Sequence, residues 1–171
     1  PLVKASLGED ISKEDLGGPS VALASGLIHN HASDEADALG QIRTWLSYLP
    51  SSAWQRPAIN QDAEGDRSTP ELVDLVAANP RQPYDMANVI TTIMDAGSFF
   101  EVQSGFGQSI LTGFARLGGQ PVAVVANQPQ HLAGAINVDA ADKATQFITV
   151  ADSFHVPLIF LTDNPGMLAG S

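Results

Sequence analysis

The chain has 171 residues, enough for one domain of ordinary size, with 8 Lys and Arg against 19 Asp and Glu and a formal net charge of -11. This acidity argues against partners such as nucleic acid and anionic membranes, which are bound mainly by Lys and Arg, but not against an anionic small ligand held by backbone N–H groups. Apolar residues make up 44% and cysteine is absent, so a core can form, whereas disulfides, thiolate metal sites and cysteine nucleophiles are excluded.

Residues 1–50 have a mixed pattern. Gly17-Gly18-Pro19 marks a turn, residues 21–28 are compatible with a strand, and residues 34–48 are predicted to form a helix capped by Ser33 and stopped by Pro50. The predicted buried face of that helix consists of apolar residues spaced three or four apart: Leu39, Ile42, Trp45, Leu46 and Leu49.

Residues 51–83 have the composition of a linker. Proline removes a backbone donor and fixes φ, so a segment rich in it should run extended over a surface. The prolines and acidic residues concerned are Pro57, Pro70, Pro80 and Pro83, with Asp62, Glu64, Asp66, Glu71 and Asp74. One short helical turn is expected at residues 70–77, with Thr69 as N-cap and Pro70 at its first position.

Residues 84–171 are more regular. A helix is predicted over residues 86–95, capped by Asp85 and ended by Gly97. Its expected apolar face is Met86, Val89, Ile90 and Ile93. The expected strands are a short one over residues 99–103 and two over 110–117 and 121–126, which are joined by the two-residue hairpin signal Gly118-Gly119.

A βαβ unit ends the sequence. A helix over residues 140–153 is expected, capped by Asp139. Its predicted inward-facing residues are Ala144, Phe147, Ile148 and Ala151. The almost wholly apolar residues 157–162 are typical of a strand buried on both faces, parallel to 121–126. Ligands bind outside the carboxyl ends of such strands, where the loops 127–134 and 163–170 should meet.

Side-chain catalytic motifs are scarce. The sequence has no nucleophile elbow, Walker loop or dinucleotide fingerprint, and Gly105-Phe106-Gly107 is too short to count as one. His29 and His31 would share one face of a strand and could hold a metal, but without an evident third ligand we favour capping or packing roles. We expect His155 to complement a helix end, and His131 to be structural or, alternatively, a general base or orienting group.

The loops at the expected ligand-binding edge offer backbone groups. Asp163 should cap amides of the following turn, with general-base work as the alternative, and Asn127 can tie the two loops together. In Asn164-Pro165-Gly166-Met167, the backbone N–H groups of Gly166 and Met167 could point into the crevice as an oxyanion hole. A purely structural turn is the alternative that this spacing also allows.

Several stretches in collinear order resemble the carboxyltransferase (beta) subunit of biotin-dependent acyl-CoA carboxylases of the acetyl-, propionyl- and methylcrotonyl-CoA types. The matching pieces are Glu14-Asp15-Leu16-Gly17-Gly18, Ser25-Gly26 with His29, Leu46-Ser47-Tyr48-Leu49-Pro50, Pro83-Tyr84-Asp85-Met86, Phe100-Glu101-Val102-Gln103, Gly113-Phe114-Ala115-Arg116, Val124-Val125-Ala126-Asn127-Gln128-Pro129, residues 140–143 and Asp163-Asn164-Pro165-Gly166-Met167.

The resemblance implies an α/β fold of the crotonase (ClpP-like) type, a ββα superhelix present in part. Residues 1–50 would be the C-terminal end of the acyl-CoA-side half, 51–83 the connector and 84–171 the start of the biotin-side half. Implied partners are a biotin carboxylase and biotin carrier subunit and further copies of the subunit, in a ring expected to be hexameric. No metal is expected in this subunit, and without a targeting segment we expect a cytoplasmic protein, although a mature mitochondrial matrix chain would look the same.

The family mechanism needs little side-chain chemistry. Carboxybiotin releases CO2, the biotin nitrogen removes the α-proton of the CoA thioester, and the enolate captures CO2. Both negative charges develop on oxygen, where backbone N–H pairs can stabilise them. By resemblance, the amides of Gly166 and Met167 form a candidate oxyanion hole, and Asn127, Asn164, Pro165 and Gly166 lie on the biotin side.

Departures from the family pattern qualify these expectations. The family's two glycine-rich oxyanion motifs are not in this sequence, and Met167, Ala169 and Ala22 stand where Phe, Pro and His are usual. We therefore expect a piece of a longer subunit that is inactive by itself. Two alternatives are a biotin-independent crotonase-superfamily enzyme acting on CoA thioesters and a non-catalytic assembly fragment.

Overall fold

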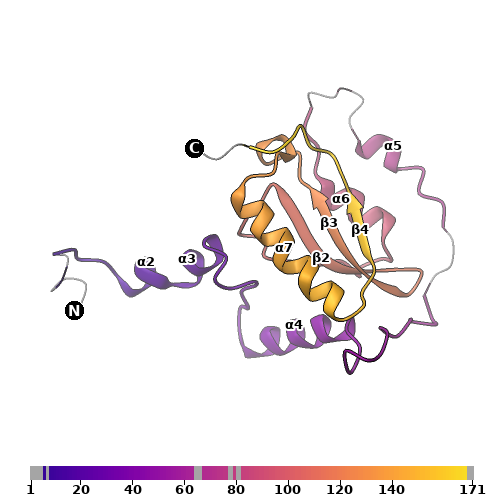
Figure 1. Cartoon of the computed structure of the whole chain (residues 1–171), viewed down its shortest axis with the longest axis horizontal. Coiled ribbons are helices and arrows are strands. Elements are labelled where there is room, and N and C mark those ends of the chain that lie inside the picture. The colour runs from indigo at the N-terminus through magenta and orange to yellow at the C-terminus, as the bar shows by residue number, and fades with distance from the viewer. Residues whose placement is uncertain (1–5, 7, 64–66, 77–78, 80–81, 169–171) are drawn as a thin grey trace.

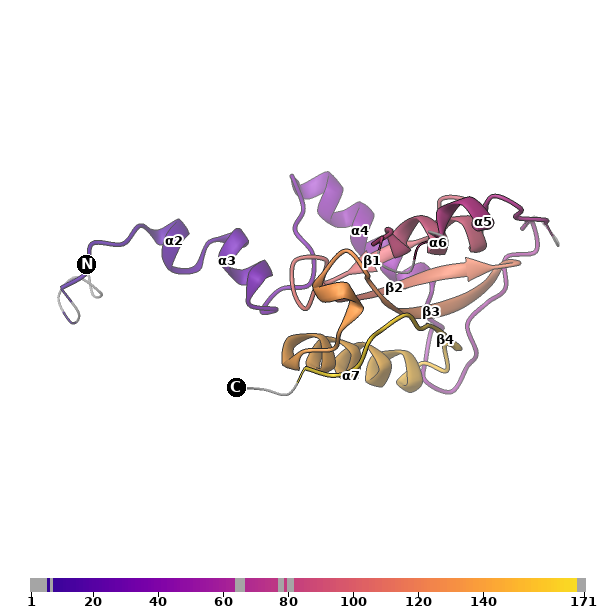
Figure 2. The same ribbon diagram turned by 90° about the horizontal axis from the view of Figure 1, so that it is seen from above.

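A four-stranded sheet with helices on both faces organises the C-terminal half of the chain (Figure 1). In the computed structural model the described residues are 6, 8–63, 67–76, 79 and 82–168. The strands lie in the order β1-β2-β3-β4. Their bounds are Phe100–Val102, Ile110–Leu117, Gln120–Asn127 and Leu158–Leu161. Seen from above, α6 (Met86–Ile93) covers one face of the sheet and α7 (Val138–Ser153) covers the other (Figure 2).

The hairpin between β2 and β3 confirms its glycine signal. The two strands pair antiparallel from Ile110 opposite Asn127 to Leu117 opposite Gln120. Gly118 and Gly119 have φ values of 56° and 78°, the left-handed conformations that a two-residue turn of this hand requires. β1 pairs antiparallel with β2, as expected of adjacent strands with a short connection.

The βαβ unit is also confirmed, because β3 and β4 pair in parallel across α7. The predicted cap Asp139 is wrong: α7 begins earlier, and the Asn137 side chain accepts a hydrogen bond from the Ala140 N–H at 2.9 Å. Asp139 instead lies in the first turn, where an acidic side chain suits the helix dipole. Burial of β4 on both faces is wrong as well, since none of its four residues is fully buried and Phe160 is 56% exposed.

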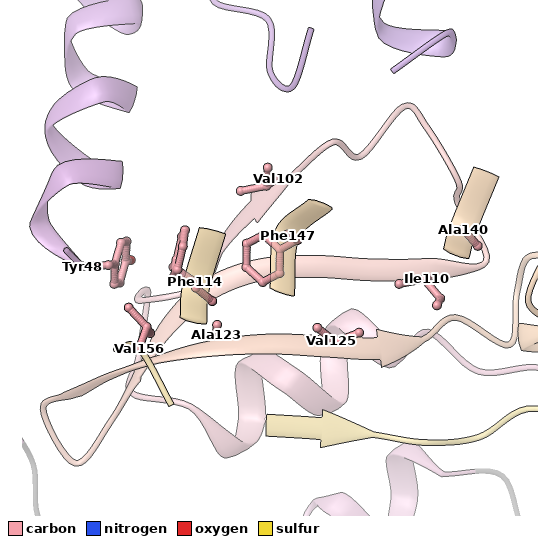
Figure 3. Packing of buried hydrophobic residues seen from close by; sticks show 10 residues of the cluster. Tyr48, Val102, Ile110, Phe114, Ala123, Val125, Ala140, Phe147 and Val156 are labelled. Carbon is pink, nitrogen blue, oxygen red and sulfur yellow. The ribbon is translucent and has the colours of Figure 1, made fainter. Parts of the chain in front are cut away.

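Two apolar clusters fill the space on either side of the sheet. On the α7 side, Phe114 stacks on Tyr48 at 5.7 Å between ring centroids and lies 5.0 Å from the Phe147 ring (Figure 3). The buried members of this cluster are Tyr48, Val102, Ile110, Phe114, Ala123, Val125, Ala140, Phe147, Ala151 and Val156. The buried members on the α6 side are Met86, Val89, Ile90, Met94, Leu111, Ala115, Val122, Val124 and Ala126.

The N-terminal segment departs most from expectation. Residues 21–28 do not form a strand: residues 21–24 lie in the short helix α3 (Pro19–Ala24), which follows the short helix α2 (Lys13–Gly17) directly after Gly18. Pro19 at the first helical position explains the start of α3, because proline is preorganised for a helical φ there.

Helix α4 (Glu35–Ser47) is where the sequence places a helix, but its cap is Asp34, whose side chain accepts from the Asp37 N–H at 2.9 Å. Ser33 instead donates its own N–H to the Asp37 carboxylate at 2.8 Å. The predicted buried face is wrong for Leu39, Ile42 and Leu46, each of which is more than half exposed. The remaining two members, Trp45 and Leu49, pack against the α7-side cluster.

The segment between α4 and α6 contains one short helix, α5 (Leu72–Leu75), among its described residues. Glu71, and not Thr69, is at its N-cap position, and residues 64, 66, 77 and 80 of the predicted linker lie outside the described residues. Helix α6 is capped by Asp85 as predicted, but it ends at Ile93 with Met94 as C-cap, before Gly97. Within the described part of the chain, no helix combines the length and the hydropathy that a membrane span needs.

Candidate functional site

The loops after β3 and β4 meet at the carboxyl end of the sheet, as predicted. An isolated parallel bridge joins Ile136, just before α7, to Met167, after β4. The Ile136 N–H donates to the Gly166 carbonyl at 3.1 Å, and the Leu168 N–H donates to the Ile136 carbonyl at 2.9 Å. In Figure 1 the yellow segment that follows β4 runs beside the orange loop that leads into α7.

Asn127 ties the two loops together, which confirms its predicted role. Its buried side chain donates from Nδ2 to the Gly134 carbonyl at 2.9 Å and accepts at Oδ1 from the Asp163 N–H at 3.3 Å. Gly134 has a φ of 79°, and a Cβ at this position would lie 2.4 Å from the Asp163 carbonyl oxygen. Only glycine allows the loops this close approach. Gly134 ends the short 3-10 helix η1 (Leu132–Gly134).

The turn formed by Asn164, Pro165, Gly166 and Met167 exposes backbone at this edge. In this parallel bridge Ile136 forms its backbone hydrogen bonds with Gly166 and Leu168, the two residues on either side of Met167. The N–H of Met167 itself therefore points away from Ile136. Gly166 has a φ of 138° and nothing lies within 4 Å of the place a Cβ would take. The Met167 side chain is 82% exposed. The turn can therefore present backbone donors to a ligand.

Asp163 is oriented by a tyrosine. Its carboxylate accepts a hydrogen bond from the Tyr84 hydroxyl at 2.8 Å. Among the described residues no amide of the following turn donates to this carboxylate, so the expected cap is replaced by the tyrosine contact. Burial, followed by the hydrogen bond and the charge of Asp163, raises the pKa of Tyr84 to about 12.

A second polar network joins the end of β3 to the start of α6. The buried Gln128 donates from Nε2 to Asp85 Oδ1 at 2.7 Å and accepts at Oε1 from the Met86 N–H at 3.2 Å. Sequence reasoning missed this pair, although Gln128 belongs to the stretch Asn127-Gln128-Pro129 that carried the resemblance. This network fastens the start of α6 to the end of β3.

A buried charge lies under the sheet. Lys143, on α7, donates from Nζ to the Ile110 carbonyl at 2.8 Å and is 1% exposed. Burial lowers the pKa of Lys143 to about 8, against an opposing attraction from Glu101. Burial also raises the pKa of Glu101. This pair was missed as well, although residue 143 lies one turn before the inward-facing Phe147.

The histidines do not gather into a site. His131 precedes η1 at its N-cap, and the ring of His155 lies 2.8 Å from the Ala53 carbonyl oxygen. His29 and His31 use their carbonyl groups to accept from Gln103 N–H and from the Gln41 side chain. No group of three metal-ligating side chains is found among the described residues.

Comparisons with known proteins agree with one another. The family profile described as "Carboxyl transferase domain" matches residues 1–171. The chain is 40% identical over 179 residues to the biotin-dependent acetyl-/propionyl-coenzyme A carboxylase beta5 subunit of Mycobacterium tuberculosis (strain CDC 1551 / Oshkosh), an alignment that covers 99% of this chain and 32% of that protein. It is 41% identical over 181 residues to the propionyl-CoA carboxylase beta chain of Saccharopolyspora erythraea, covering 99% and 33%. The chain thus spans about a third of the length of these curated relatives.

The fold has a close counterpart among solved structures. The hexameric transcarboxylase 12S core with methylmalonyl-coenzyme A and methylmalonic acid bound superposes with a TM-score of 0.93 at 37% identity, covering 99% of this chain and 33% of that one. This likeness confirms the fold class and the resemblance predicted from the sequence.

Proposed function

The chain belongs to the carboxyl transferase domain family, and on this premise we propose that it is part of the carboxyltransferase component of an acyl-CoA carboxylase. This enzyme would move a carboxyl group from carboxybiotin to the α-carbon of a short acyl-CoA. The observation that carries the proposal is the exposed backbone of the turn at Gly166 and Met167, at the carboxyl end of a βαβ unit. Ligands bind at this end of such sheets.

The proposed organisation follows from the order of the elements. Residues 1–50 would close the acyl-CoA-side half, 51–83 would connect the halves, and 84–171 would begin the biotin-side half. In support, α6 begins at Met86, and the four strands found in the described part of the chain follow it. The segment 51–83 contains only the short helix α5 among its described residues.

The donor set at the turn fits biotin, whose ureido oxygen becomes negative. Biotin, carried on a partner domain, would supply the carboxyl group and accept the α-proton of the thioester. The N–H groups of Gly166 and Met167 would donate to the developing charge, and a single donor of this kind contributes about 3–4 kcal/mol. Asn164 and Pro165 would shape the turn, and Asn127 would keep it against the loop after β3.

The proposed partners follow from the relatives. The Mycobacterium tuberculosis relative is named a biotin-dependent beta subunit, and the transcarboxylase 12S core is described as a hexamer assembly. We therefore propose a biotin carboxylase and biotin carrier as partners, and a hexameric ring of carboxyltransferase subunits. A short acyl-CoA substrate is supported by the methylmalonyl-coenzyme A bound in that core.

The proposed function can be tested by running the reaction in reverse on the native assembly. Malonyl-CoA or methylmalonyl-CoA should carboxylate biotin at a measurable rate. No activity with any short acyl-CoA would count against the proposal. Decarboxylation that needs no biotin and is insensitive to avidin would instead favour a biotin-independent enzyme of the same superfamily.

Substitution of Gly166 tests the turn itself. Gly166→Val places a branched side chain where the ligand would approach, and we expect turnover to fall at least about a hundredfold, as for loss of an oxyanion donor. Gly118→Val is the matched control, since Gly118 also has a positive φ of 56° and nothing lies within 4 Å of the place its Cβ would take. Gly118 lies at the opposite end of the sheet, so the Gly118→Val variant should assemble and turn over like the wild type. Equal losses in both variants would contradict the assignment.

A further inference from the structure

We propose that Tyr84 is a positioning residue for the turn 164–167: its hydroxyl holds Asp163 and thereby fixes the turn's backbone donors. The inference rests on the proposed function and deepens it, because it adds a residue from a distant part of the chain to the biotin side. Tyr84 and Asp163 are 79 residues apart, so their contact fastens two elements that the chain does not otherwise join directly.

The tyrosine is itself held firmly. Its ring is partly buried and packs against the α6-side cluster. The next residue, Asp85, caps α6 by accepting from the Ala87 N–H at 2.9 Å, and it also accepts from the Gln128 side chain at 2.7 Å. The hydroxyl therefore extends from a rigid base, which a positioning group requires.

Asp163 is held by two hydrogen bonds and by the close approach of Gly134. The carboxylate accepts from Tyr84, the N–H donates to Asn127 Oδ1 at 3.3 Å, and the carbonyl lies against Gly134. The next residue begins the turn. Of these three contacts the first uses the Asp163 side chain. Without the Tyr84 hydroxyl, Asp163 keeps one hydrogen bond at 3.3 Å and the contact with Gly134, so the turn that follows it is held less firmly.

A free carboxylate at this place would harm the proposed chemistry. It lies three residues before Gly166, whose amide would stabilise negative charge, and a like charge nearby opposes that stabilisation. The hydroxyl directs the carboxylate through a charge-assisted hydrogen bond. Because the pKa of Tyr84 is raised to about 12, the hydroxyl stays a donor throughout the working pH range.

Tyr84→Phe in the native assembly tests the inference, because it removes the hydroxyl and keeps the ring. We expect kcat for biotin carboxylation to fall about tenfold, the effect of one charge-assisted hydrogen bond, with KM for the acyl-CoA unchanged. Hydrogen exchange of the peptide containing residues 163–168 should become faster. Tyr48→Phe is the matched control: its hydroxyl donates to the Ser98 carbonyl on another part of the molecule, and kcat and exchange at residues 163–168 should stay as in the wild type.

A double-substitution cycle separates positioning from general destabilisation. In a background of Asp163→Ala, Tyr84→Phe should change neither kcat nor exchange further, since the acceptor is gone. Unchanged kcat and exchange in Tyr84→Phe, or equal changes in Tyr84→Phe and Tyr48→Phe, would overturn the inference. An inactive wild-type assembly would refute the proposed function instead, and the exchange comparison would still decide whether Tyr84 holds the turn.

Discussion

At the scale of single residues, Lys143 carries the clearest electrostatic consequence. Its ammonium group is buried beneath the sheet with one backbone acceptor, the Ile110 carbonyl. Burial lowers its pKa from 10.5 to about 8, although the attraction of Glu101 acts in the opposite direction. The folded state therefore bears a cost for keeping this side chain charged at neutral pH.

The free energy of unfolding should consequently rise with pH. Between pH 8 and 10.5 the folded state binds fewer protons at Lys143 than the unfolded state does, and stability increases wherever this holds. The full effect is about 3 kcal/mol, of which about 2 kcal/mol should develop between about pH 7.5 and 9.5. Urea unfolding across this interval measures it.

Lys143→Met provides the comparison, because it keeps an unbranched side chain and removes the titration. The variant should lack the rise with pH, whatever the fixed cost of leaving the Ile110 carbonyl without its donor. The raised pKa values of Tyr48 and Tyr84 lower stability only as pH passes 10, beyond the measured interval. Parallel curves for wild type and variant would show that Lys143 does not titrate as proposed.

The sequence predicted a helix N-cap correctly where a single polar residue stood at the right place to cap the helix. Asp85 is followed directly by an apolar helical face, and it is the cap of α6. Near the start of α4 and of α7 the sequence offers more than one polar residue, and Asp34 and Asn137 cap these helices in place of Ser33 and Asp139. Local competition of this kind is settled by the path of the incoming chain, which spacing alone does not reveal.

At the scale of elements, the β2–β3 hairpin contains two glycines with different constraints. Both need a positive φ, but nothing lies within 4 Å of a Cβ on Gly118, whereas a Cβ on Gly119 would lie 2.1 Å from the Asn60 carbonyl oxygen. Asn60 also donates its N–H to the Gly119 carbonyl at 3.0 Å. The hairpin thus anchors the segment around Asn60 as well as joining two strands.

Replacing each glycine by alanine should separate backbone strain from packing. Gly118→Ala should cost about 1 kcal/mol of unfolding free energy, the strain of a left-handed conformation. Gly119→Ala should cost about 3 kcal/mol, because strain is joined by displacement of Asn60. Thermal or urea unfolding measures the stability that each variant loses. Equal losses would contradict the expected clash between a Cβ at Gly119 and Asn60.

Elements with strong local signals were predicted well, and elements decided by their surroundings were not. The glycine pair set the hairpin, and α6 and α7 follow their apolar periodicity. Half of the strand expected at residues 21–28 is instead the end of the helix α3, because β-branched and apolar residues there are outweighed by Pro19 and alanine. The apolar residues of α4 and β4 were expected to be buried, but burial depends on neighbours that periodicity does not identify.

At the scale of the whole molecule, the position of the candidate site followed from topology. The meeting of loops 127–134 and 163–170 needs only a parallel βαβ unit, and the described parts of both loops are joined by Asn127 and the Ile136–Met167 bridge. The Tyr84–Asp163 contact and the attraction between Lys143 and Glu101 could not be predicted, because they join segments that only the folded chain brings together. Residues 169 and 170 of the second loop lie outside the described residues.

The 171-residue chain expressed alone should be unable to carry out the proposed transfer. Negative charge develops on two oxygens in that reaction, on the biotin ureido group and on the thioester enolate, and each needs its own preorganised donors. By our proposal the turn at Gly166 and Met167 would serve the first oxygen, and neither of the family's two glycine-rich motifs is in this sequence. Proximity of the two reactants, which accounts for much of such rate enhancements, would also be lost.

The measurement is biotin carboxylation from malonyl-CoA or methylmalonyl-CoA, run on the isolated chain and on the native assembly at equal molar concentration. We expect a rate at background for the chain and a clear rate for the assembly. Cooperative urea unfolding of the isolated chain must accompany the assay, since loss of activity is informative only if the two clusters around the sheet have formed. A folded chain that turns over at the rate of the assembly would mean that both charges are stabilised within these 171 residues, and the division into two halves would have to be abandoned.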